Sequence, residues 1–164
     1  MKLNFTTERL TLSPLMLADD EFILTLVNTP GWLQFIGDRN IHTPDDARAY
    51  IRKIMGNPLF FYWVVRLTDA DIPVGIITLI KRDYLESHDI GFAFLPGYAR
   101  RGYAFEAARV VLTYLSEEKI FARILATTVP GNTNSIGLLT KLGLIFDKEI
   151  QYNGHPLLLF GLSI

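Results

Sequence analysis

The sequence predicts an α/β or α+β layered fold built on a mixed sheet. Runs of β-branched and aromatic residues alternate along the chain with segments of helical periodicity, which is the first sign of such a fold. The chain has 164 residues, of which 49% are hydrophobic, and this is enough for one sizeable core. The linkers between the predicted elements are short, so residues 1–164 are expected to form a single domain.

The first third of the chain is predicted to hold one strand and two helices. Residues 9–13 alternate with period two, as in a half-buried strand. Residues 17–28 carry three acidic side chains early, where they favour a helix, and Pro30-Gly31 is expected to end it. Thr43 can cap the second helix, because Pro44 follows at its first position and an aspartate stands three residues after the cap.

The middle of the chain is predicted to form a hairpin, a strand and a long helix. Residues 60–67 and 72–81 are β-branched and aromatic runs separated by a short polar turn, the pattern of a hairpin. Residues 89–95 form the next predicted strand. Residues 104–118 repeat apolar side chains three or four apart, which predicts a helix with one buried face.

The last third is predicted to hold a strand, a helix and a closing hairpin. Residues 121–129 form the strand, and Asn132 can cap a helix that ends at Gly143. Residues 146–152 and 157–162 flank an Asn-Gly turn and therefore predict a hairpin. The edge strands of this hairpin could pair between two subunits, giving a homodimer, or stay unpaired.

The segment from Leu95 to Ala107 joins a strand to a helix through a turn that carries Arg100, Arg101 and Gly102. The first turn of a helix offers unpaired N–H groups and the positive end of the helix dipole, and glycine lets an anion come close to the backbone. The turn therefore predicts a phosphate-binding site. The alternative is that both arginines are simply exposed to solvent. Tyr103 and Ala104 stand where a Walker loop has Lys and Ser/Thr, which excludes that motif.

The amino-acid composition limits the classes of molecule that the protein is expected to bind. The formal net charge is −1, so no global basic field points to nucleic acid, and a small molecule or a peptide is the expected partner. The chain has no cysteine, which excludes a thiol nucleophile and fits the cytoplasm. No signal peptide or long apolar segment is present, so no membrane partner is expected. The three histidines lack metal-ligand spacing, and no metal is expected.

Several motifs, taken in order, resemble the GNAT N-acetyltransferase superfamily. They include residues 100–104 (RRGYA), residues 132–135 (NTNS) and the Lys141-Leu142-Gly143 end of the last predicted helix. Residues 91–107 and the early Glu8-Arg9-Leu10-Thr11-Leu12 are similar to the branch that acetylates the N-termini of ribosomal proteins. The resemblance covers nearly the whole chain.

The resemblance implies a GNAT-type mixed, mostly antiparallel central sheet, with helices on both faces and a V-shaped splay between the central strands. It also implies an acetyl-CoA-dependent N-acetyltransferase whose acceptor is a primary amine, either a small molecule or a protein N-terminus. Transfer is expected to be direct within a ternary complex. The residues expected to bind the co-substrate are the backbone groups of Phe94 and Leu95, then Arg100, Arg101, Gly102, Tyr103, Ala104, Asn132 and Ser135.

Three residues are candidates for the chemistry. Strand alternation puts Asp89 on the face with the small residues Gly91 and Ala93, so Asp89 is the preferred general base and His88 the second. Alternatively, the amine loses its proton to bulk water. Ser135 is the candidate donor to the leaving thiolate, because Leu139 stands where many relatives carry a tyrosine acid.

Three further questions have two possible answers each. Leu139 and Ala99 both depart from the family pattern, so a non-catalytic acyl-CoA-binding module with the same fold is the second functional hypothesis. On the acceptor side, Trp32 and Phe35 could form a binding wall in a loop between helices, or pack in the core. Asp38 and Arg39 could be a solvated turn or could recognise a charged acceptor.

Overall fold

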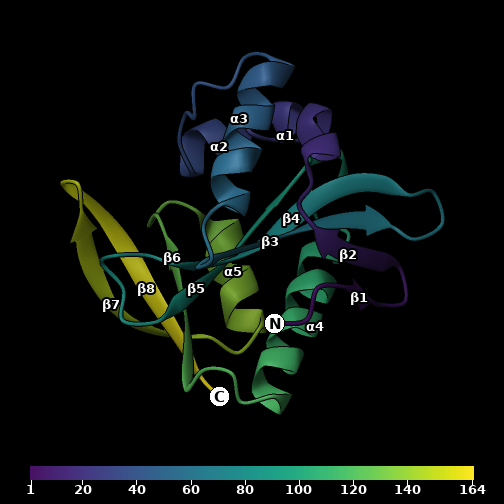
Figure 1. Cartoon of the computed structure of the whole chain (residues 1–164). Coiled ribbons are helices and arrows are strands. Elements are labelled where there is room, and N and C mark those ends of the chain that lie inside the picture. Colours follow the sequence, from purple (N-terminus) through teal and green to yellow (C-terminus); the bar gives the residue numbers. More distant parts are fainter.

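The computed structural model describes residues 1–164 as one eight-stranded sheet with helices on both faces (Figure 1). The strand order is β1-β2-β3-β4-β5-β6-β8-β7, and every neighbouring pair is antiparallel except β5 with β6. The strands are β1 (Phe5–Thr6), β2 (Leu10–Pro14), β3 (Phe60–Leu67), β4 (Ile72–Lys81), β5 (His88–Phe94), β6 (Arg123–Thr128), β7 (Ile145–Tyr152) and β8 (His155–Ser163).

The helices divide between the two faces of the sheet. Three helices from the first third of the chain gather at the top of Figure 1, and the other two lie across the lower half. The first group is α1 (Asp20–Leu26), α2 (Pro30–Phe35) and α3 (Pro44–Met55), and the second is α4 (Tyr103–Glu117) and α5 (Thr133–Lys141). Two single 3₁₀ turns, η1 (Leu17–Asp19) and η2 (Pro96–Tyr98), precede α1 and α4.

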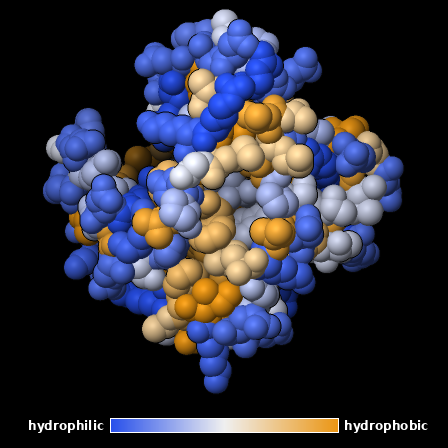
Figure 2. Space-filling model, viewed as in Figure 1, coloured by the Kyte–Doolittle hydropathy of each residue, from blue (hydrophilic) through white to orange (hydrophobic).

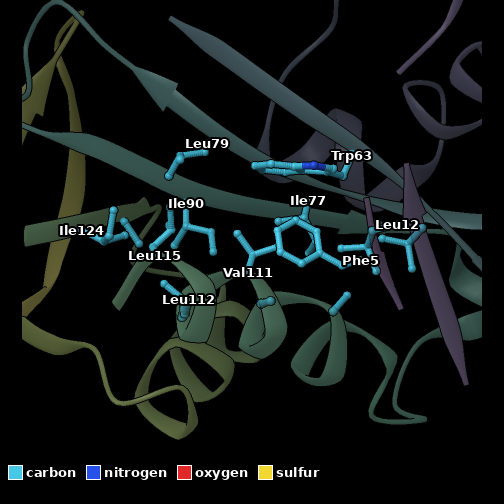
Figure 3. Packing of buried hydrophobic residues seen from close by; sticks show 14 of the residues in the cluster. Phe5, Leu12, Trp63, Ile77, Leu79, Ile90, Val111, Leu112, Leu115 and Ile124 are labelled. Atoms are coloured by element: carbon cyan, nitrogen blue, oxygen red, sulfur yellow. The ribbon is translucent and has the colours of Figure 1, made fainter. Parts of the chain in front are cut away.

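Alternation along the strands creates a separate core on each face. On β3, Trp63 and Val65 belong to the core under α4, whereas Val64 between them belongs to the core under α1 to α3. Figure 3 shows the first core, where Val111 and Leu115 of α4 lie under the side chains of the sheet. The apolar face predicted for the helix at residues 104–118 therefore packs against the predicted strands, as expected.

The capped start of α3 is confirmed. The Thr43 hydroxyl accepts a hydrogen bond from the Asp46 N–H at 3.1 Å, and the Asp46 carboxylate accepts one from the Thr43 N–H at 3.1 Å. This reciprocal pair satisfies N–H groups that have no partner within the helix.

The prediction for residues 30–35 was wrong. Pro30-Gly31 does not simply end a helix, because Pro30 starts the short helix α2. Proline suits the first position of a helix as well as it breaks a helix interior, since its N–H would be unpaired there in any case. The two-residue strand β1 was not predicted either, because two residues carry no period.

The central strands diverge from one another. β5 and β6 run parallel and share only one paired position, Asp89 opposite Leu125, whereas β5 pairs with β4 along its whole length. Beyond that position, the two strands separate on the side where β5 leads into the turn before α4. This geometry confirms the expected V-shaped splay.

The C-terminal hairpin forms the other edge of the sheet. β7 is the outermost strand, and its Ile145 and Phe146 are 75% and 53% exposed. A homodimer through this edge stays a prediction. No helix combines the length and the apolar character needed to cross a membrane.

Candidate active site

A cavity of about 800 Å³ opens where β5 and β6 separate. Its lining comes from both faces of the sheet: α2 and α3 contribute on one face, and the turn before α4 together with α5 contributes on the other. Figure 2 shows apolar residues gathered across the middle of the molecule, between more hydrophilic regions. The cavity therefore extends to both faces of the sheet. We name its two parts after the ligands expected there: the donor chamber is the part beside α4 and α5, and the acceptor chamber is the part beside α2 and α3.

The edge of β5 offers free backbone groups to the donor chamber. The Leu95 N–H donates to the Val74 carbonyl at 2.9 Å, so odd-numbered residues of this segment turn their backbone groups toward β4. The backbone groups of Phe92 and Phe94 consequently face the gap to β6. Leu95 does not line the cavity, and its carbonyl accepts from the Tyr98 N–H at 2.9 Å, so its contact with the co-substrate stays a prediction.

The turn before α4 has the conformation that an anion site needs. Gly102 is the N-cap of α4 with φ of 79°, in the left-handed region. The first bond within α4 runs from the Glu106 N–H to the Gly102 carbonyl, so the N–H groups of Tyr103 and Ala104 have no partner within the helix. Gly102, Tyr103 and Ala104 all line the donor chamber. Three of the predicted residues therefore lie together at one helix start.

The side chains of the two arginines in this turn point in different directions. Arg100 lines the donor chamber, with a positive φ of 61°. Arg101 does not line it, so its role in phosphate binding stays a prediction. Its guanidinium lies 5.8 Å from the centre of the Tyr98 ring, and its carbonyl accepts from Arg9 Nη1 at 3.0 Å. Adjacent residues in an irregular turn point in different directions, so only one of the pair reaches the chamber.

Glu106 does more than place a negative charge near the start of α4, because it also links this helix to the N-terminal segment. Its carboxylate accepts from the Thr7 hydroxyl at 2.6 Å, from the Arg9 N–H at 3.0 Å and from Arg9 Nε at 2.7 Å. Burial opposes ionisation, but these hydrogen bonds and the charge of Arg9 outweigh it and lower the pKa of Glu106. The first turn of α4 is thereby fixed to the segment between β1 and β2.

The start of α5 forms the opposite wall of the donor chamber. Asn132 Oδ1 accepts from the Ser135 N–H at 3.2 Å, which confirms the predicted cap. Asn132 and Ser135 both line the cavity, as do the buried Leu139 and the exposed Lys141.

Asp89 lies at the narrow end of the splay. It is 3% exposed, and Arg82 Nε donates to its two carboxylate oxygens at 3.1 and 3.0 Å. The Thr127 hydroxyl of β6 donates to the same carboxylate at 3.5 Å. Burial raises the pKa of Asp89 above its ordinary value near 3.8, although the charge of Arg82 opposes this. Asp89 also lines the cavity, so it combines a raised pKa with access to a ligand.

The structure does not bring His88 to the site. Its ring lies 4.5 Å from Phe121 and 6.4 Å from Phe61, and it does not line the cavity. Burial, and then the charge of Lys81, lower its pKa. The strand has no bulge between the two residues, so their side chains point to opposite faces.

The acceptor chamber is aromatic and carries positive charge. Trp32 is 6% exposed and belongs to the core under α1 to α3, yet it also lines the chamber, so both interpretations of this residue hold. The half-buried Phe35 and the exposed Arg39 line the chamber as well. Asp38 does not line it, and its carboxylate accepts from the Asn40 N–H at 2.8 Å.

Sequence reasoning missed several polar residues of the cavity, among them Tyr50, Tyr62, Arg82 and Thr127. Burial and the adjacent Tyr50 raise the pKa of the Tyr62 phenol, against the charges of Arg82 and Arg39. One available signal was Thr78, a hydroxyl inside the otherwise apolar run of β4. Thr78 stands opposite Tyr62 on one side and opposite Gly91 on the other.

The sequence and the fold are similar to those of known acetyltransferases. Residues 9–145 match the family described as "Acetyltransferase (GNAT) domain". The uncharacterised N-acetyltransferase YnaD of Bacillus subtilis is 30% identical over 142 residues, which span 87% of this chain and 82% of YnaD.

Solved structures share the fold. A GNAT-family acetyltransferase from Bacillus anthracis superposes with a TM-score of 0.83 at 27% identity, and the match covers 98% of each chain. RimL, a ribosomal L7/L12 α-N-protein acetyltransferase solved in complex with coenzyme A, superposes with a TM-score of 0.85 at 12% identity. That match covers 99% of this chain and 98% of RimL.

Proposed function

Because this chain belongs to the acetyltransferase (GNAT) family and is an acyltransferase, we propose that it moves the acetyl group of acetyl-CoA directly to a primary amine. The amine is a protein N-terminus or a small molecule. The observation that carries the proposal is the cavity that passes through the splay, with Asp89 at its narrow end. Donor and acceptor can enter from opposite faces and meet there, which a direct transfer requires. The N-acetyltransferase relative favours this enzyme over a non-catalytic acyl-CoA-binding module.

The donor chamber fits acetyl-CoA, which supplies an acetyl group activated as a thioester. The unpaired N–H groups of Tyr103 and Ala104 and the side chain of Arg100 suit the pyrophosphate. The free backbone groups of Phe92 and Phe94 suit the amide-rich pantetheine arm, which would bind along β5 as a missing strand does.

The acceptor chamber supplies the proton chemistry. An ammonium group must lose its proton before its nitrogen can attack, and Asp89 is the one carboxylate that lines the cavity. Its raised pKa brings it closer to the pH at which a base must take up a proton. We assign it as the general base. The Ser135 hydroxyl lies on the wall of the donor chamber and is the proposed hydrogen-bond donor to the departing thiolate.

Arg100→Ala is expected to weaken coenzyme A binding more than Arg101→Ala does, because only Arg100 lines the donor chamber. The loss should be larger at low salt than at high salt, since dissolved ions already screen part of the attraction. Calorimetric titration of both variants with coenzyme A at two salt concentrations measures this. Equal losses in the two variants would contradict the assignment.

Trp32→Ala is expected to destabilise the protein by roughly 3–5 kcal/mol, because it deletes a buried aromatic side chain. Phe35→Ala is the matched variant, since Phe35 is only half-buried and lines the same chamber. It should raise the KM for the amine with a smaller loss of stability and with unchanged affinity for coenzyme A. Urea unfolding and steady-state kinetics separate the two effects.

The proposed function is tested by thiol detection with acetyl-CoA and a panel of primary amines. Thiol release that needs both acetyl-CoA and an amine supports it. Binding of acetyl-CoA with no amine-dependent release by any acceptor would favour the non-catalytic module instead.

A further inference from the structure

Among the charged residues that line the cavity, positive charges outnumber negative ones. Four are basic and one is acidic: Arg39, Arg82, Arg100, Lys141 and Asp89. Arg100 and Lys141 lie in the donor chamber, where the phosphates of the co-substrate would meet them. Arg39 and Arg82 lie in the acceptor chamber with the single carboxylate, so this chamber has a net positive charge without any acceptor bound.

Arg82 can bind a further anion while it holds Asp89. Its contact with Asp89 uses Nε alone, at 3.0 and 3.1 Å from the two carboxylate oxygens. Neither Nη nitrogen has a hydrogen-bond partner within the protein. A guanidinium has five N–H groups in a planar fork, so most of its donors remain available on the side away from Asp89.

Arg39 carries the other guanidinium group of the acceptor chamber, and this group is unpaired. It takes part in none of the eight ion pairs of the protein, and its side chain folds back near Gly37, where an ideal Cβ would stand 3.5 Å from Arg39 Nη1. Arg39, Arg82 and Tyr62 line the same cavity, and both positive charges oppose the rise in the pKa of the Tyr62 phenol. Most exposed arginines face open solvent, whereas this one lines a cavity.

The surroundings strengthen an ionic contact at this place. Trp32, Phe35 and Ile80 line the same chamber and reduce its polarity. Attraction between opposite charges grows as the local dielectric constant falls. Because the raised pKa keeps the Tyr62 phenol protonated, that hydroxyl is a neutral donor that can also bind a carboxylate.

On the premise of the proposed function, we propose that the acceptor is a primary amine that also carries a carboxylate, which Arg39 and Arg82 bind while the amine faces Asp89. The same charges repel polycationic acceptors such as polyamines and aminoglycosides. The carboxylate can be the α-carboxylate of a free amino acid or the side chain of an acidic first residue in a peptide. Both present the same group to the two guanidinium groups.

Acetylation kinetics with matched amines test this proposal. The arms are free aspartate, a peptide beginning with Asp, the same peptide beginning with Asn, and spermidine. We expect kcat/KM for at least one of the two aspartate arms to exceed that for the Asn peptide and for spermidine by tenfold or more. A preference for free aspartate alone identifies an amino acid, and a preference for the Asp peptide identifies an acidic N-terminus. A preference for spermidine, or no preference among the four, would overturn the proposal.

Arg39→Gln isolates the charge without disturbing the buried ion pair. It should raise the KM for the carboxylate-bearing acceptor by about tenfold and change the KM for the Asn peptide much less. Arg52→Gln is the control, because Arg52 is an exposed arginine of α3 that does not line the cavity. An equal effect of the two substitutions would contradict the assignment of Arg39.

Binding without turnover separates this proposal from the proposed function. Calorimetry of the coenzyme A-bound protein with succinate, which is aspartate without its amine, should show binding that Arg39→Gln weakens and Arg52→Gln does not. If no amine is acetylated, the proposed function fails, and succinate binding dependent on Arg39 would still support the anion site. Absence of succinate binding in the unmodified protein would overturn that site.

Discussion

Replacing Gly102 with valine is expected to weaken coenzyme A binding by roughly tenfold to hundredfold. Gly102 has φ of 79°, and a β-branched residue enters that region only with strain of about 1–3 kcal/mol. The turn would then occupy its binding conformation only part of the time, and the apparent affinity falls by that fraction. The new Cβ would also stand 3.3 Å from Arg9 Nη2. Calorimetric titration with coenzyme A measures the change.

Gly97→Val is the matched control for this experiment. Gly97 lies in the same segment, and its added Cβ would have no neighbour within 4 Å and no left-handed φ to adopt. Its affinity for coenzyme A should stay within about twofold of the unmodified protein, since an exposed substitution of this kind usually has an effect within about 0.5 kcal/mol. A folded Gly102→Val protein with unchanged affinity would show that the pyrophosphate does not lie at this turn.

Asp89→Asn is expected to lower kcat by about 10²- to 10⁴-fold, the usual contribution of a general base. Asparagine has nearly the same shape and can still accept a hydrogen bond from Arg82 Nε through its side-chain oxygen. It cannot take a proton from the ammonium group. Affinity for coenzyme A should change little, because the contacts proposed for it lie at the turn before α4. Steady-state kinetics at saturating acetyl-CoA measure the effect.

His88→Gln is the control for Asp89, since the two residues are adjacent on β5 and point to opposite faces. The substitution should leave kcat nearly unchanged, because His88 does not line the cavity. A large loss of kcat in His88→Gln together with an active Asp89→Asn enzyme would reverse the assignment of the base.

The pH dependence of kcat follows from the raised pKa of Asp89. A general base acts only when it is unprotonated, so activity falls as the pH decreases through the pKa of that group. Burial places this pKa above the ordinary value near 3.8, and the acidic limb of the profile should lie correspondingly higher. Asp89→Asn should remove that limb. An unaltered limb in the variant would exclude Asp89 as its origin.

The repeating elements could be predicted from the sequence because their patterns are local. The two strands of the β3–β4 hairpin occupy the predicted residues, and the cap at Thr43 forms as expected. The start of α2 could not be predicted in the same way, because a Pro-Gly pair can end one helix or begin another. The sequence around residues 30–31 does not distinguish the two outcomes.

The donor side of the site was more predictable than the acceptor side. Gly102 and Asn132 belong to short segments whose geometry follows from neighbouring residues. The acceptor chamber instead combines α2, α3 and the four strands β3, β4, β5 and β6, and the pairing of Arg82 with Asp89 depends on the path of the chain after β4. Arg101 and Leu95 lie next to residues that line the cavity but do not line it themselves. Sequence proximity does not decide which way a backbone group or a side chain points in an irregular turn.

Direct transfer from acetyl-CoA to an amine inside one cavity can be followed through the masses of the amine and of the protein. Mass spectrometry of a reaction mixture that contains the protein, acetyl-CoA and an accepted amine measures both. We expect the amine to gain one acetyl group, the protein mixed with acetyl-CoA alone to keep its mass, and Asp89→Asn to slow formation of the product. An acetylated protein that later passes its acetyl group to the amine, or an amine that gains no acetyl group, would contradict direct transfer.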